Sequence, residues 1–169
     1  MKDYQEVILF LYPRLERAAE DIAQIVEAGA LASVSGKESA ERCAGRLLGY
    51  LQTRECFLAV RDAVDGMRAQ LSEEERFLLE YKYFRRKGVL QGEFRDMDLH
   101  CSLRTYYRKQ DRLARRMNAL FLRAGLTETW FAETLGGLPF FASALRCLRA
   151  RRGALVDKRA RRELTLRRK

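Results

Sequence analysis

Apolar residues recur at three- and four-residue steps along most of the chain, and this spacing predicts helices. No stretch shows sustained alternation of apolar and polar residues rich in β-branched side chains, and the sequence has only two prolines. In the N-terminal segment the apolar positions are Ile8, Leu11, Tyr12, Leu15, Ala19, Ile22, Ile25 and Val26. The pattern therefore predicts an all-α protein.

Residues 1–70 are expected to form a long helical hairpin. Pro13 predicts a kink in the first helix, or a restart with proline in its first turn. A turn-rich connector follows, and Ser35 with Glu38 has the spacing of a capping box for a second helix that extends to about Ala69. The apolar positions of this second helix are Ala40, Ala44, Leu47, Leu51, Leu58, Val64 and Met67. Such a hairpin would serve in dimerisation or partner binding.

The stretch "LSEEERFLLEYKYFRRKG" begins with a helix start signal. Ser72 is a suitable N-cap, and Glu75 three residues later completes the spacing of a capping box. The neighbouring carboxylates favour the positive end of the helix dipole. Gly88 is expected to end the helix, which gives a helix over about 72–86.

Two further helices are expected before residue 125. A short helix at about 91–98 lies within "LQGEFRDMDLHC", and Ser102 caps a longer helix over 102–124 that ends at Gly125. The apolar positions of the longer helix are Leu103, Tyr106, Leu113, Met117, Leu120 and Ala124. Beyond residue 125, a short helix from Thr127 and a last helix are expected, with a second small core made by Trp130, Phe131, Phe140 and Phe141.

The net charge of +10 is concentrated in two segments. Residues 71–123 carry 13 basic and 8 acidic side chains, and residues 146–169 carry 11 basic and 2 acidic ones. A polyanionic partner explains such clustering, because each lysine or arginine placed on a phosphate releases condensed counterions. A basic end that merely keeps the protein in solution is the alternative for the C-terminal segment.

Other chemistry is weakly represented. The four cysteines have no metal-finger spacing and are expected to be buried free thiols, and the single histidine, His100, is not part of a recognisable metal or catalytic motif. No phosphate loop, carboxylate pair or nucleophile motif stands out. No apolar run reaches the roughly 20 residues of a membrane span. We expect a cytoplasmic protein without metal or cofactor that is not an enzyme.

The last of the three helices within 71–124 has two distinct sides. Arg104, Arg108, Arg112 and Arg115 advance at four- and three-residue steps on one side, and the apolar positions occupy the other. The order of a capped helix, a short helix and a basic helix is that of a helix-turn-helix whose last helix enters the major groove. Tyr106 is expected in the core, whereas Tyr107 is open between stacking on DNA and surface packing.

The segment also resembles region four of sigma factors and the phage-type regulators built on it, including ArpU-like proteins. Glu75, Arg76, Leu78, Leu79, Tyr83 and Phe84 match the first part of the family pattern, and Ser102, Thr105 and Arg108 match the second. The resemblance covers about 50 of the 169 residues and implies sequence-selective binding of double-stranded DNA. In true sigma factors it also implies contact with RNA polymerase.

The family pattern is broken just before Ser102. Asp96 stands where a small residue normally lies at the helix crossing, and His100 takes the place of a glycine. A carboxylate at that crossing would be costly to bury without a partner. Either Phe94 and Met97 supply the packing of a displaced helix, or the unit no longer grips DNA in the usual way.

The leading hypothesis is a transcriptional regulator of bacterial or phage type, with a hairpin at 1–70, a helix-turn-helix at 71–124 and basic C-terminal helices at 125–169. A homodimer would suit this function. The expected DNA-binding residues are Ser102, Arg104, Thr105, Tyr107, Arg108, Lys109, Arg112, Arg115 and Arg116. The expected phosphate contacts are Arg85, Arg86, Lys87, Arg149, Arg151, Arg152, Lys158, Arg159, Arg161 and Arg162.

Two alternatives remain open at this point. The chain could be an adaptor or inhibitor that engages RNA polymerase through the sigma-like unit. It could also bind RNA through its arginine-rich C-terminal end, because such segments often fold on RNA.

Overall fold

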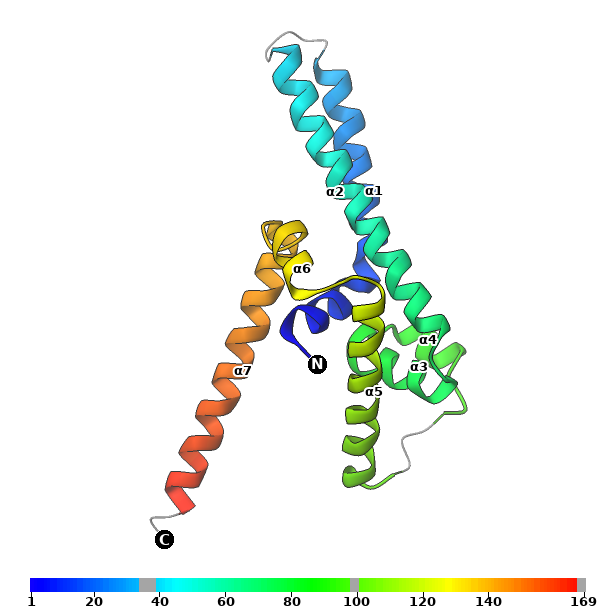
Figure 1. Ribbon diagram of the computed structural model, residues 1–169, viewed down its shortest axis with the longest axis vertical. Helices are drawn as coiled ribbons and strands as arrows, with labels where there is room; N and C mark the ends of the chain where they lie inside the picture. Colours follow the sequence, from blue (N-terminus) through cyan, green and yellow to red (C-terminus); the bar gives the residue numbers. More distant parts are fainter. Residues whose placement is uncertain (34–38, 98–100, 167–169) are drawn as a thin grey trace.

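The computed structural model describes the backbone of residues 1–33, 39–97 and 101–166, and the side chains of residues 1–31, 39–97 and 101–154. Within these ranges every regular element is a helix, so the predicted all-α class is confirmed. Figure 1 shows an elongated molecule, in which α5 and α7 extend on the side opposite to the far end of α1 and α2.

Two long helices, α1 (Asp3–Ser33) and α2 (Ala40–Ala69), pack against each other (Figure 1). A Cβ atom on Gly29 would lie 2.9 Å from Cδ2 of Leu47, so the glycine allows the two helices to approach closely. The side chain of Ser39 caps α2 by accepting a hydrogen bond from the backbone N–H of Arg42. The capping box expected at Ser35 and Glu38 lies outside the described residues.

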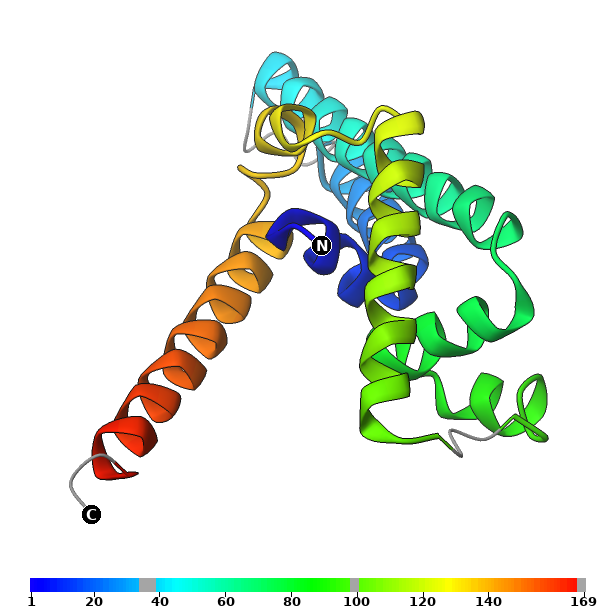
Figure 2. The same ribbon diagram turned by 60° about the horizontal axis from the view of Figure 1, so that its bottom comes forward.

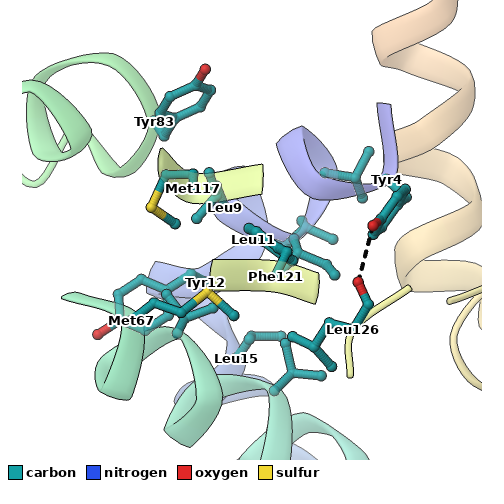
Figure 3. Close-up of a cluster of buried hydrophobic side chains, with 14 of the residues drawn as sticks. Tyr4, Leu9, Leu11, Tyr12, Leu15, Met67, Tyr83, Met117, Phe121 and Leu126 are labelled. Atoms are coloured by element: carbon teal, nitrogen blue, oxygen red, sulfur yellow. Dashed lines mark hydrogen bonds between the residues drawn. The ribbon is translucent and has the colours of Figure 1, made fainter. Parts of the chain in front are cut away.

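The first helix continues through Pro13, and Figure 2 shows its N-terminal part turned away from the direction of the hairpin. This N-terminal part is the most buried segment of the protein. Ile8, Leu9 and Leu15 are inaccessible to solvent, and the Tyr4 hydroxyl donates a hydrogen bond to the backbone carbonyl of Leu126 (3.0 Å; Figure 3). The first turns of α1 therefore hold the C-terminal helices to the rest of the chain.

One hydrophobic core contains residues from each of the three predicted segments, 1–70, 71–124 and 125–169. Figure 3 shows how Met67 of α2, Met117 and Phe121 gather around the first half of α1. Phe131 and Phe141 belong to this same core, and Trp130 and Phe140 pack on it. These aromatic residues do not form a separate second core, because the Phe57 ring of α2 lies 5.5 Å from the Phe140 ring and meets the Phe141 ring edge-on at 5.6 Å.

The far end of the hairpin is poorly buried. Ile25 and Leu51, which were predicted to line apolar stripes, are 48% and 40% exposed. Leu31 is 73% exposed and Leu48 is 58% exposed. The stripes are covered only where α1 and α2 meet the remaining helices, so apolar side chains are left on the surface of the hairpin end.

The helix predicted over 72–86 divides into α3 (Glu73–Leu79) and η1 (Glu80–Phe84), which is a π-helix. Ser72 and Glu75 form the expected capping box. Gly88 does not end the helix: the chain turns at Arg85, whose backbone is left-handed with φ 54°.

A short helix, α4 (Lys87–Gly92), follows at once. The prediction of a short helix at 91–98 was therefore wrong, because the early turn at Arg85 lets the chain resume a helix at Lys87. α4 packs chiefly against η1, whereas α5 (Leu103–Arg123) packs chiefly against α3 and α2.

The chain after α5 returns to the first turns of α1. Gly125 adopts φ 72°, a conformation that glycine takes without strain, and reverses the chain where the sequence predicted. Thr127 caps α6 (Glu128–Thr134), as expected. The long α7 (Pro139–Leu166) begins in the core next to α1 and then extends away from it (Figures 1 and 2).

Candidate nucleic-acid interface

The candidate interface is built on α5, which begins where the sequence predicted. The Oγ atom of Ser102 accepts a hydrogen bond from the backbone N–H of Thr105 at 3.2 Å. The Ser102 and Thr105 hydroxyl groups also lie 3.0 Å apart and share a hydrogen bond. Both hydroxyl groups therefore stabilise the first turn of α5, and this turn is the part of a recognition helix that normally meets base edges.

One side of α5 is exposed along its length. Arg104, Arg108, Arg112 and Arg115 are exposed on this side, together with Tyr107 and Asp111. A helical step of 100° places all six within one arc of the helix surface. We call this set the outer row of α5. It combines four cations, one carboxylate and one aromatic ring.

Two of the predicted DNA-binding residues instead hold α5 against α3. The Lys109 ammonium lies 2.5 Å from a carboxylate oxygen of Glu74, and the hydrogen bond that it donates to this carboxylate raises the pKa of Lys109. The Arg116 guanidinium lies 3.6 Å from the carboxylate of Glu75 and donates a hydrogen bond to the carbonyl oxygen of Gln70. These two cations lie on the flank of α5 and neutralise acidic residues of α3.

The opposite side of α5 is buried through Gln110, Leu113, Met117, Leu120 and Phe121. Leu103 was predicted on this side but is 76% exposed. It lies in the first turn of α5, and the buried residues of the helix begin at Gln110. Gln110 is the polar exception, since both polar atoms of its side chain are buried without a hydrogen-bond partner.

The two adjacent tyrosines have unequal environments. Tyr106 is half-buried and packs on the core, as predicted in part, and burial raises the pKa of its hydroxyl group. Tyr107 is 63% exposed. Its ring meets the Tyr106 ring edge-on, with centroids 5.6 Å apart. Tyr106 thus supports Tyr107 from behind and leaves much of the Tyr107 ring accessible.

Two residues before α5, Asp96 and His100, depart from the family pattern, and the structure describes the first of them. Asp96 is exposed and lies in the turn after α4, so its carboxylate does not pay a burial cost. Phe94 is buried and its ring lies 5.7 Å from that of Phe77 in α3. The packing position is therefore filled by Phe94. His100 lies outside the described residues.

The basic run Arg85–Lys87 is not a uniform phosphate site. Arg86 binds Glu80, whose carboxylate accepts its Nε–H at 2.8 Å, its Nη2–H at 2.6 Å and its backbone N–H at 3.1 Å. The hydrogen bonds from Arg86 to Glu80 raise the pKa of this guanidinium. Arg85 and Lys87 are exposed. Only these two residues of the run are placed to meet a phosphate without breaking an internal ion pair.

The basic residues of α7 are divided in the same way. Arg149 and Arg152 form ion pairs with Asp3 of α1, and Arg152 also pairs with Glu6 at 2.8 Å. Arg151 is exposed on another side of α7. The side chains of Lys158, Arg159, Arg161 and Arg162 lie outside those that the structure describes. The backbone there continues α7 as a helix.

The cysteines and candidate metal ligands give no second site in the described part of the chain. Cys43 is buried, but Cys147 is exposed, so the prediction that all four thiols are buried was wrong. Cys147 lies in the first half of α7, next to Leu148, which packs on the core. Among the described residues, no three potential ligands come together in a group that could hold a metal ion.

Comparisons with known proteins find no matching family model, no similar curated protein and no similar solved structure. Within the described ranges, no helix combines the length and apolarity that crossing a membrane requires.

Sequence reasoning missed the acidic partners of the basic residues. Glu74 and Glu75 were interpreted only as part of a helix start, and Glu80 was given no role. Each of the three neutralises a cation outside its own helix. Glu74 and Lys109 are far apart in the sequence, so no local spacing marks the pair. The missed signal was the excess of carboxylates in "SEEERFLLE", which exceeds what one helix N-terminus needs.

Proposed function

We propose that this protein is a DNA-binding transcriptional regulator that presents the outer row of α5 to the major groove. The observation that carries the proposal is the separation of cations on α5. Lys109 and Arg116 are used for ion pairs with α3, whereas Arg104, Arg108, Arg112 and Arg115 are exposed and share one side of the helix.

The first turn of α5 supports sequence readout. Arg104 lies two residues after the N-cap residue Ser102 and is exposed. An arginine in this position can bind guanine through two hydrogen bonds. Tyr107 is exposed one turn later and offers a ring for apolar contact with a thymine methyl group or a sugar. The carboxylate of Asp111, in the middle of the outer row, would repel a phosphate and would accept a hydrogen bond from the amino group of a base.

The proposed helix-turn-helix would consist of α3, α4 and α5, which follow one another along the chain in the order of the sigma region four pattern. The early position of α4 and its packing on η1 are departures from that pattern. The proposal therefore rests on the exposed side of α5 and does not require that α4 occupy the family's usual position.

The C-terminal end of α7 would supply contacts with phosphates that do not depend on sequence. The segment 146–169 has a large basic excess, and α5 and α7 extend from the same side of the molecule (Figure 1). Counterion release would make this contribution strongly dependent on salt concentration.

The test is in vitro selection of bound duplex DNA, followed by gel-shift titration of the selected sequence over a salt series. The wild-type chain should enrich a defined sequence, and Arg104→Ala should lower discrimination against a changed base by about 1–3 kcal/mol. Lack of enrichment together with lack of any shift at low salt would exclude DNA binding. Competition with structured RNA separates the case in which α7 binds RNA.

A second candidate function is engagement of a protein partner through the exposed end of the hairpin. Leu31, Leu48 and Ile25 are exposed there, and such apolar residues are often covered by a partner. The partner could be a second copy of the chain, as suits a regulator that binds paired half-sites, or RNA polymerase. Sedimentation of the wild type and of the double variant Leu31→Lys, Leu48→Lys, both without polymerase, distinguishes the two partners. If the partner is a second copy, the wild type should sediment as a dimer and the variant as a monomer. If the partner is RNA polymerase, both should sediment as monomers.

A further inference from the structure

A cavity of about 470 Å³ lies between α1, the turn at Arg85 and the first half of α7. Its volume falls within the range of about 300–1,000 Å³ that is typical of small-molecule sites. Apolar side chains from three elements line it, among them Val7 and Leu11 of α1, Phe84 of η1 and Leu148 of α7. The cavity is therefore formed by the tertiary fold and not by a single helix surface.

Three arginines line the same cavity, and each comes from a different element. They are Arg14 of α1, Arg85 of the turn and Arg151 of α7. No aspartate or glutamate is among the described residues that line it. Three cations next to an apolar surface, without a carboxylate to neutralise them, favour a ligand that has both an anionic group and an apolar body.

The backbone at Arg85 is a second observation at this place. Arg85 has φ 54°, in the left-handed region that residues with a Cβ atom seldom adopt, and it follows a π-helix directly. A left-handed residue commonly ends a helix, but it is usually glycine, and π-helical turns recur at functional sites. The hydrogen bond that Arg85 makes to the Lys82 carbonyl uses Nε, which leaves its Nη groups to meet an anion.

The position of α7 also favours a formed cavity. Arg149 and Arg152 bind Asp3 and Glu6 of α1, which fixes this part of α7 against α1. Arg151 lines the cavity instead. The cavity wall is thus held in place by ion pairs that do not use the arginines of the cavity.

We propose that this cavity binds a small organic anion, with its apolar body against Leu11, Phe84 and Leu148 and its acidic group among Arg14, Arg85 and Arg151. The acidic group is a carboxylate, sulfonate or phosphate, all of which pair with arginine through the same hydrogen bonds. This site is separate from the outer row of α5, and its occupation does not depend on the proposed binding of DNA.

The test uses two fluorescent probes that differ in charge. 8-Anilinonaphthalene-1-sulfonate has the aromatic body of N-phenyl-1-naphthylamine with an added sulfonate. The full-length protein should bind the sulfonate at one saturable site, with a Kd about tenfold lower than that of the neutral probe. Equal Kd values for the two probes would overturn the proposal.

Matched variants locate the site. Arg14→Gln and Arg151→Gln should each raise the Kd of the sulfonate about tenfold, because each removes a charged hydrogen-bond donor. Arg17→Gln and Arg146→Gln are controls on the same two helices, since both residues are exposed and neither lines the cavity. Circular dichroism and thermal melting show that each variant is folded. If the cavity variants bind the sulfonate as the controls do, the proposal is wrong.

The place of binding can also be tested on the wild-type protein, without any substitution. Cys147 is exposed and lines the cavity, whereas Cys101 lies at the start of α5. Bound sulfonate should slow the alkylation of Cys147 by iodoacetamide at least about fivefold, measured for each cysteine by mass spectrometry, and should leave the rate at Cys101 unchanged. An unchanged rate at Cys147 under saturating probe would refute the proposed place of binding.

Discussion

The carboxylate of Glu80 is 1% exposed and is held by three hydrogen bonds from Arg86. The guanidinium of Arg86 in turn lies 5.7 Å from the centre of the Tyr12 ring and 5.4 Å from that of Phe84. This ion pair joins the first residue of η1 to the residue that precedes α4, and the guanidinium lies against the Tyr12 ring of α1. The direction of the chain after the π-helix depends on it.

Replacing Glu80 by glutamine should destabilise the protein by about 2–3 kcal/mol. The substitution leaves Arg86 without its charged partner, and the usual cost of breaking a buried pair is reduced here because the Arg86 side chain is 31% exposed. Urea denaturation measures the loss. Glu73→Gln, at an exposed position of α3, is the control and should change stability by less than about 0.5 kcal/mol. Equal effects of the two substitutions would contradict the assigned role.

Gln110→Met should raise the free energy of unfolding by about 1 kcal/mol. The Gln110 side chain is buried without hydrogen-bond partners, and methionine has a similar shape without that desolvation cost. Gln5→Met is the matched comparison and should destabilise the protein, because the buried Gln5 side chain donates a hydrogen bond to Asn118 at 2.9 Å. Denaturation curves that shift in the same direction for both variants would count against this interpretation.

Stability should fall as the pH rises above about 10. Burial and the hydrogen bond to Asp65 raise the pKa of Tyr12, and burial raises the pKa of Tyr83. The unfolded chain then loses these protons at a lower pH than the folded one, so stability present below pH 10 is lost at a rate of up to about 1.4 kcal/mol per pH unit for each group.

Urea unfolding at about pH 9 and about pH 10.5 measures this loss. Tyr12→Phe with Tyr83→Phe should reduce the dependence on pH, whereas Tyr107→Phe, at an exposed ring, should leave it as in the wild type. The cause named here is incorrect if the double variant keeps the wild-type slope.

Arg104→Gln should mainly weaken the binding of DNA, whereas Arg116→Gln should mainly lower stability. Arg104 is exposed, so its loss should weaken the binding of DNA and leave stability within about 0.5 kcal/mol. Arg116 contacts Glu75 and the Gln70 carbonyl, so its loss should lower stability by about 1 kcal/mol with a smaller effect on affinity. Gel shifts and thermal melts on the same samples compare the two, and a reversed order would show that the outer row is wrongly defined.

Changing Lys158, Arg159, Arg161 and Arg162 together to glutamine should reduce the dependence of DNA affinity on salt. Each phosphate contact contributes about 0.9 to the slope of log K against log salt, so the slope should fall by up to about 3.6. Sequence preference should not change, because these residues are proposed to contact phosphates only. If the tail does not contact DNA, the fourfold variant should have the same slope as the wild type.

Local signals of the sequence predicted the starts of three helices. Ser72, Ser102 and Thr127 each cap the helix that was expected to follow, because the cap is a contact between residues three positions apart. The reversal at Gly125 was also predictable from the residue type. These features depend on a few neighbouring residues and not on the tertiary structure.

The misplaced features depend on distant residues. The helix was expected to end at Gly88, but the turn lies at Arg85, where Arg86 finds the Glu80 carboxylate and the ring of Tyr12. The apolar pattern of α5 included Leu103, whose side chain is exposed. The charged spacing of α5 did not separate Lys109 from the outer row, because its partner Glu74 lies on another helix.

The uneven burial of the hairpin has a consequence for amide hydrogen exchange. Apart from Cys43, the buried residues of α2 begin at Phe57, and those of α1 end at Ala19. The far end of the hairpin can therefore open without disturbing the core, at a free energy well below that of global unfolding. Amides near Leu48 should exchange much faster than those near Val60, and a partner that covers the exposed leucines should be visible first as slower exchange in this part of α2.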